Sequence, residues 1–136
     1  MTKTVKWYST FMSAAAAVIY ILAGADILDA GDIRESGEAP PVIFYVAGAF
    51  YLFAGCLVHI EKKWLRLGLG IINALIISVF FQMWADRPDV VTSAAGLGTK
   101  IAQFLLEIGL IYLIIKTWNR SPADRASAGA GDAGKD

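Results

Sequence analysis

Apolar residues in this chain fall into four long blocks separated by short polar segments. The blocks run from about Trp7 to Leu28, from Val42 to Ile60, from Leu65 to Ala85 and from Leu97 to Trp118. A helix of about 20 residues crosses the roughly 30 Å of hydrocarbon in a bilayer, so blocks of this length are typical of transmembrane helices. The pattern predicts an all-α fold, a four-helix transmembrane bundle with up-and-down topology, in one domain over residues 1–120.

The segments between the blocks carry helix-ending signals. Residues 29–41 are acidic and finish with Pro40-Pro41, which stops one helix and can begin the next. Residues 61–64 form a tight basic turn, and Asp86 opens a loop that closes around Gly96. Residues 121–136 contain no large apolar side chain, so this stretch is expected to be a disordered cytoplasmic tail.

The distribution of basic residues predicts the orientation in the membrane. Basic residues precede the first block, occupy the turn after the second and follow the fourth: Lys3, Lys6, Lys62, Lys63, Arg66, Lys116, Arg120, Arg125 and Lys135. The other two connections are mainly acidic. By the positive-inside rule, both termini are expected in the cytoplasm, at a bacterial or archaeal cytoplasmic membrane.

The composition supports a membrane protein and argues against several classes of function. The chain is 57% hydrophobic and 18% charged, whereas about 25% charge is typical of soluble domains. Its net charge of zero gives no field that would attract nucleic acid. A single cysteine, Cys56, and a single histidine, His59, provide neither a disulfide nor a histidine cluster for a metal. We therefore expect the lipid bilayer as a partner, no cofactor and no enzymatic activity.

The first block has an alternative interpretation as a cleaved signal peptide. Lys3 and Lys6 would form the basic region, and Ala23-Gly24-Ala25 fits a cleavage site. The apolar run is longer than a signal peptide requires and continues through Ile27-Leu28, which favours a retained helix.

The fourth block carries a polar stripe. Gly96, Lys100, Gln103 and Glu107 lie on one face at 3.6 residues per turn, with Glu107 near the middle of the membrane. Ionisable residues at that depth are costly and are candidate functional residues by default. Gln103, one turn from Glu107, is a candidate hydrogen-bond partner for it.

Two interpretations of Glu107 follow. In the first, it is a proton- or cation-coupling carboxylate at the base of an outward-facing funnel that contains Lys100 and Gln103. In the second, it fixes helix packing by hydrogen bonding to polar residues at similar depth, for which the candidates are Tyr20, Tyr51 and Asn73. The second interpretation is favoured because one polar stripe is not a transport motif.

Several segments resemble the DoxX-like membrane proteins, which are small four-helix proteins. The resembling segments are 21–29 (ILAGADILD), 46–55 (VAGAFYLFAG), 64–68 (WLRLG) and Leu105-Leu106-Glu107. The resemblance lies in the layout from the first block through Arg66 and in the last block, and covers about two thirds of the chain. The family often has a glutamate where this chain has Tyr51. The resemblance implies a membrane bundle, in some members associated with quinone or redox partners, and it supplies no reaction.

These observations predict a small integral membrane protein that acts as a non-enzymatic bundle or accessory subunit. One alternative is a small proton- or cation-coupled transporter that uses Glu107, as a homodimer because four helices enclose little space. Another is a subunit of a quinone-linked membrane redox system. The sequence names neither a substrate nor a partner protein.

Overall fold

The computed structural model describes residues 1–31, 37 and 40–119. The predicted tail and most of the first connection lie outside these residues. The described part of the chain contains five α-helices and no β-strand: α1 Thr2–Gly24, α2 Pro41–Leu57, α3 Lys63–Trp84, α4 Pro88–Val91 and α5 Ala94–Trp118. The predicted all-α class is confirmed for these residues.

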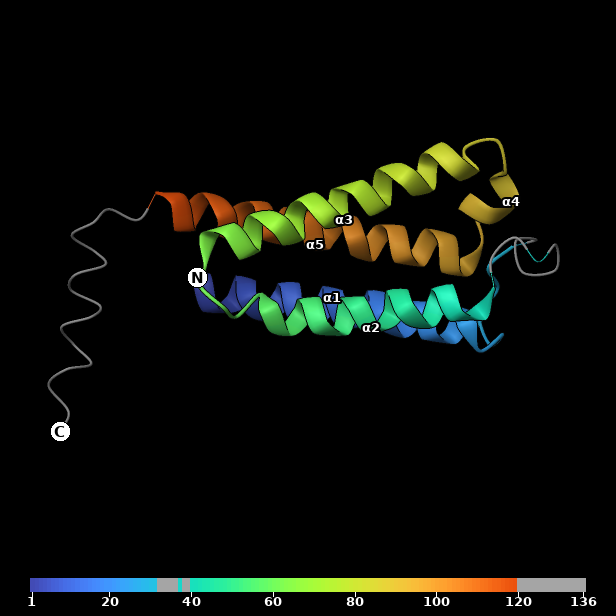
Figure 1. The fold of residues 1–136 in the computed structure, drawn as a ribbon, viewed down its shortest axis with the longest axis horizontal. Coiled ribbons are helices and arrows are strands. Elements are labelled where there is room, and N and C mark those ends of the chain that lie inside the picture. The colour runs from blue at the N-terminus through green and yellow to red at the C-terminus, as the bar shows by residue number, and fades with distance from the viewer. Residues whose placement is uncertain (32–36, 38–39, 120–136) are drawn as a thin grey trace, which may run out of the picture.

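The four longer helices lie alongside one another (Figure 1). Helix α1 packs against both α2 and α5, and α3 packs mainly against α5. The N-terminus, the turn between α2 and α3, and the end of α5 lie at one end of the molecule, and α4 lies at the other (Figure 1). The basic residues at the start of α1 and α3 therefore share one end.

Three of the helices are long and apolar enough to cross a membrane: α1, α3 and α5. This is the property expected of an integral membrane protein. Helix α2 is also apolar but has 17 residues. At about 1.5 Å per residue it is roughly 26 Å long, which is at the lower limit for a span.

The first helix is shorter than predicted, because it ends at Gly24 and not at Leu28. Asp26 adopts a left-handed conformation (φ 64°), which turns the backbone out of the helix. Aspartate tolerates this region better than most residues. The N–H groups of Ile27 and Leu28 then donate to the carbonyl of Leu22, so the end of the helix is capped although the sequence remains apolar.

The last helix starts earlier than predicted, at Ala94 and not at Leu97. Ser93 is its N-cap, with its hydroxyl accepting a hydrogen bond from the N–H of Gly96 at 3.0 Å. The short helix α4, which the sequence did not predict, precedes this cap. Its buried Val90 joins a small apolar cluster at this end of the molecule with Ala23, Ala30, Phe44 and Ala95.

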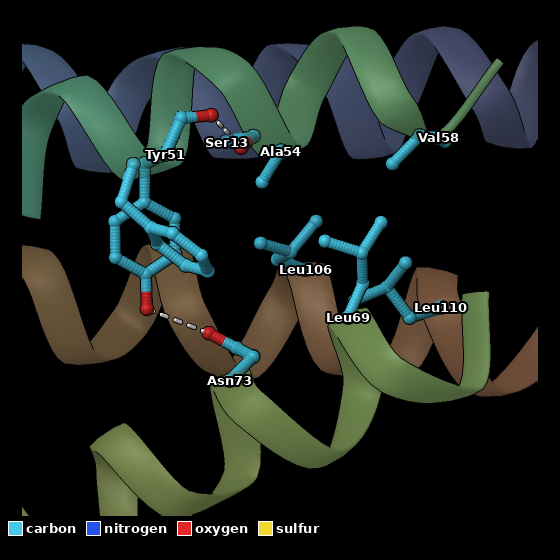
Figure 2. A pocket seen from close by; sticks show the side chains of 9 residues that line it. Ser13, Tyr51, Ala54, Val58, Leu69, Asn73, Leu106 and Leu110 are labelled. Carbon is cyan, nitrogen blue, oxygen red and sulfur yellow. Dashed lines mark hydrogen bonds between the residues drawn. The ribbon is translucent and has the colours of Figure 1, made fainter. Parts of the chain in front are cut away.

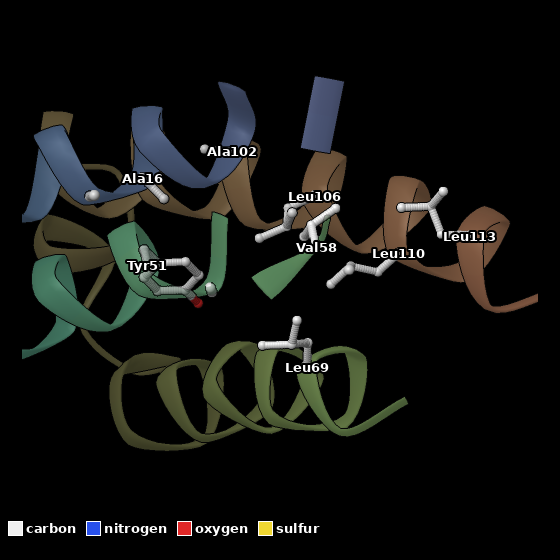
Figure 3. Packing of buried hydrophobic residues seen from close by; sticks show 10 residues of the cluster. Ala16, Tyr51, Val58, Leu69, Ala102, Leu106, Leu110 and Leu113 are labelled. Atoms are coloured by element: carbon white, nitrogen blue, oxygen red, sulfur yellow. The ribbon is translucent and has the colours of Figure 1, made fainter. Parts of the chain in front are cut away.

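The main core lies among α1, α2, α3 and α5 (Figure 3). Alanines Ala16 and Ala17 of α1 are completely buried, and their small side chains allow α2 and α5 to approach closely. Leucines of α5 fill the centre, among them Leu106, Leu110 and Leu113. This packing fixes the inward face of α5, which carries the polar stripe.

Candidate functional site

Four helices contribute one cluster of hydrogen-bonded polar side chains, which we call the polar core. It contains all six residues that the sequence singled out: Tyr20 of α1, Tyr51 of α2, Asn73 of α3, and Lys100, Gln103 and Glu107 of α5. Most of the cluster is inaccessible to solvent. Gln103 is 0% exposed and Lys100 is 4% exposed.

The polar stripe on α5 supplies three residues of the cluster, but the predicted contact between Gln103 and Glu107 is not formed. Gln103 does not bond Glu107, and its side-chain oxygen instead accepts a hydrogen bond from Lys100 Nζ at 2.6 Å. Side chains on a helix lean toward its N-terminus, so Gln103 points back along α5 toward Lys100. Both residues are buried and therefore do not form the wall of an open funnel.

The amide nitrogen of Gln103 connects α5 to α1 and α2. Nε2 donates to the hydroxyl of Tyr51 at 2.6 Å and to the hydroxyl of Tyr20 at 3.0 Å. The two tyrosine rings are stacked, with centroids 5.7 Å apart. Gln103 thus uses its oxygen and both amide hydrogens within the protein.

Asn73 extends the cluster to α3. The Tyr51 hydroxyl donates to Asn73 Oδ1 at 2.8 Å (Figure 2). Asn73 Nδ2 donates to Glu107 Oε2 at 2.8 Å and to the backbone carbonyl of Gln103 at 3.1 Å. Asn73 is therefore the residue that satisfies one oxygen of Glu107.

Four hydrogen bonds of the polar core form a chain in which donation runs in one direction. The ammonium of Lys100 can only donate, and an ionised carboxylate at Glu107 can only accept. Donation passes from Lys100 to Gln103, from Gln103 to Tyr51, from Tyr51 to Asn73 and from Asn73 to Glu107. A chain with a cation at its donor end and a carboxylate at its acceptor end polarises each bond in the same sense. This chain of bonds connects α5, α2 and α3, and the bond from Gln103 to Tyr20 adds α1. The four helices are therefore joined although Lys100 and Glu107 do not pair directly.

The aromatic ring of Phe80 helps to accommodate the buried charge of Lys100. Its Nζ lies 4.0 Å from the centroid of the Phe80 ring on α3, within the range of a cation–π interaction. No ion pair with Lys100 occurs among the residues that the structure describes. Gln103 and Phe80 are therefore the groups that accommodate this cation.

The cavity enclosed beside the polar core is too small for a substrate. A cavity of about 10 Å³ lies between the core leucines and the Tyr51–Asn73 pair (Figure 2). About 10–15 Å³ is the minimum for a single water molecule. An organic ligand cannot reach the centre of the cluster without moving the helices.

Glu107 differs from the other members because it also faces outward. It lines a groove of about 300 Å³ between α3 and α5. The other lining residues are apolar: Leu67, Gly70, Ile71 and Ala74 of α3, and Ile111, Ile114 and Ile115 of α5. Glu107 Oε1 accepts no hydrogen bond from the residues that the structure describes. One carboxylate oxygen is thus held in the polar core and the other is available to the groove.

Two residues away from the polar core, Arg66 and His59, make polar contacts that were not anticipated. Arg66, one of the basic residues that predict the cytoplasmic side, is 2% exposed. Its guanidinium donates to the Thr117 hydroxyl and to the Val58 carbonyl, which joins α3 to α5 and to the end of α2. The available signal was its position inside the predicted third block. His59 Nε2 lies 3.0 Å from the Thr10 hydroxyl, in a separate contact between the turn after α2 and α1.

Comparisons with known proteins give no assignment. No family model matches the chain, and neither a curated protein nor a solved structure matches it. Within the described residues, no group of three or more His, Cys, Asp or Glu side chains could hold a metal ion. The polar core and the groove are the features of the described residues that bear on function.

Proposed function

We propose that this chain is a four-span protein of a bacterial or archaeal cytoplasmic membrane that acts as a non-enzymatic accessory subunit of a membrane complex. The polar core is the observation that carries this proposal. Its side chains are engaged with one another across four helices, which suits a role in holding the bundle together. Buried polar contacts in membranes stabilise helix packing in this way.

Four spans with both termini in the cytoplasm account for the distribution of charge. Helix α2 packs along the length of α1, so it would share the membrane with the three longer helices. Lys6 of α1 pairs with Glu61, which lies just after α2, at 2.7 Å. This end of the bundle also carries Lys62 and Lys63, so the positive-inside rule directs it to the cytoplasm.

Retention of the first helix is part of the proposal. Helix α1 supplies Tyr20 to the polar core, and its Ser13 hydroxyl donates to the Tyr51 carbonyl at 2.5 Å. Cleavage after Ala25 would remove both contacts and uncover the core. Intact-mass measurement of protein extracted from membranes is expected to give the full 14.6 kDa. Loss of the first 25 residues would eliminate the four-span arrangement.

The accessory role is tested by purification from native membranes. The tagged chain, extracted in a mild detergent such as digitonin, is expected to bring down a stable partner in a fixed ratio. The resemblance to DoxX-like proteins makes a redox complex one class of partner to look for, identified by a quinone or haem in the purified material. A homogeneous monomer would count against the accessory role.

A coupled transporter is the second candidate, and the outward-facing oxygen of Glu107 favours it. In this case Glu107→Gln abolishes proton-linked flux into proteoliposomes while the bundle stays folded. The polar core itself is a poor proton path, because the amides of Gln103 and Asn73 donate hydrogen bonds but do not readily release protons. A proton would have to reach Glu107 through the groove. Absence of flux in the wild type would remove this candidate.

A further inference from the structure

The groove between α3 and α5 combines a shape and a charge that lipid does not match. It runs along about two turns of each helix, from Leu67 to Ala74 on α3 and from Glu107 to Ile115 on α5. Its floor is open because Gly70 lacks a side chain. A Cβ at that position would lie 3.3 Å from Ile114 Cδ1 and 3.6 Å from Glu107 Oε1.

The Glu107 carboxylate in this groove needs a hydrogen-bond donor. Glu107 lies eleven residues before Trp118, at the end of α5, which corresponds to roughly 16 Å along the helix. A carboxylate oxygen at that depth is costly against acyl chains, which have nothing to donate. Lipid headgroups lie at the interface and do not reach it. A cationic side chain in the same plane of the membrane would supply the missing hydrogen bonds.

The shape of the groove suits a helix. Gly70 and Ala74 are four residues apart and line the same groove, a small-xxx-small spacing that lets another helix approach closely. A second copy of this chain is a poor occupant, because its lysine nearest this depth, Lys100, is buried in its own polar core. The exposed residues nearest to Glu107 on α5 are the apolar Phe104, Ile108 and Ile111.

We propose that the groove between α3 and α5 docks a transmembrane helix of a different protein, which carries a lysine or arginine near mid-membrane that pairs with Glu107. This inference rests on the proposed accessory role and specifies the partner's chemistry. Asn73 holds Oε2 of Glu107, so the carboxylate is oriented with Oε1 toward the incoming helix.

The test uses the full chain in lipid nanodiscs and two labelled synthetic transmembrane peptides. Both consist of leucine and alanine, and one has a single lysine at its centre where the other has leucine. We expect the lysine peptide to bind about tenfold more tightly, as a charge-assisted hydrogen bond within a membrane allows. Fluorescence energy transfer between peptide and protein measures both affinities.

Variants of the chain separate charge from shape. Glu107→Gln is expected to abolish the preference for the lysine peptide. Gly70→Leu is expected to weaken the binding of both peptides, because the new side chain fills the groove. Gly68→Leu is the matched control, since a Cβ on Gly68 would meet no atom within 4 Å. This control should bind like the wild type.

Four outcomes would overturn the inference. Equal binding of the two peptides, or a preference that survives in Glu107→Gln, removes the charge pairing. A homodimer that Gly70→Leu dissociates would place a second copy in the groove. The accessory role and the docking site can fail separately. If Gly70→Leu retains a native partner, the docking site is refuted and the accessory role stands. If the lysine peptide binds but no native partner is found, the accessory role is refuted and the docking site stands.

Discussion

Replacing Gln103 with leucine tests whether the polar core holds the bundle together. Gln103 is fully buried, and its side chain makes three hydrogen bonds, to Lys100, Tyr20 and Tyr51. Leucine has a similar volume, so the change removes polar contacts with little change in packing.

The size of the effect follows from the three bonds. The two bonds to tyrosines cross between helices, and such bonds in membrane proteins contribute about 0.6 kcal/mol each. Loss of the third leaves the buried ammonium of Lys100 without its acceptor, at a cost of about 1–3 kcal/mol. Gln103→Leu should therefore lower the free energy of unfolding by about 2–4 kcal/mol.

The measurement is reversible unfolding in mixed micelles by titration with sodium dodecyl sulfate, followed by circular dichroism. Tyr20→Phe is the control, because it removes one hydrogen bond to Gln103 and should cost about 0.6 kcal/mol. If Gln103→Leu destabilises the bundle no more than Tyr20→Phe does, the polar core is not what stabilises the bundle.

Three further predictions use the same unfolding measurement. Gly96→Ala should destabilise by about 1–3 kcal/mol, because its Cβ would collide with the backbone carbonyl of Val90 in α4, whereas Gly68→Ala should be neutral or stabilising by about 0.5–1 kcal/mol. An unchanged free energy of unfolding in Gly96→Ala would contradict the tight packing at the start of α5. Ser93→Ala should cost about 1 kcal/mol through loss of the α5 N-cap, and no loss would show that the cap is dispensable. Glu107→Gln should keep wild-type stability because an oxygen remains for Asn73, whereas Glu107→Ala should cost about 1–3 kcal/mol; equal effects would argue against this bond.

The membership of the polar core could be predicted from the sequence. Asn73, Gln103 and Glu107 are polar residues within long apolar blocks, and facing other helices is the least costly position for such residues in a membrane. Tyr20 and Tyr51 lie at similar depth on blocks of comparable length. Residue type and depth together were enough to predict these side chains as members of one cluster.

The pairing within the polar core could not be predicted from depth alone. The lean of side chains along α5 joins Gln103 to Lys100, and the position of α3 brings Asn73 to Glu107. The end of α1 was also missed, because apolarity continues past Asp26 while the backbone there turns left-handed. The groove depends on how α3 and α5 are spaced, which no periodicity in a single helix encodes.

The most direct test of the accessory role and the docking groove is purification of the tagged chain and its groove variants from native membranes. With the proposed accessory role, the chain elutes in a complex larger than its own 14.6 kDa. The Gly68→Leu variant should retain this complex, and the Gly70→Leu variant should lose it while remaining folded. A wild-type chain that elutes as a monomer under mild extraction would contradict the account.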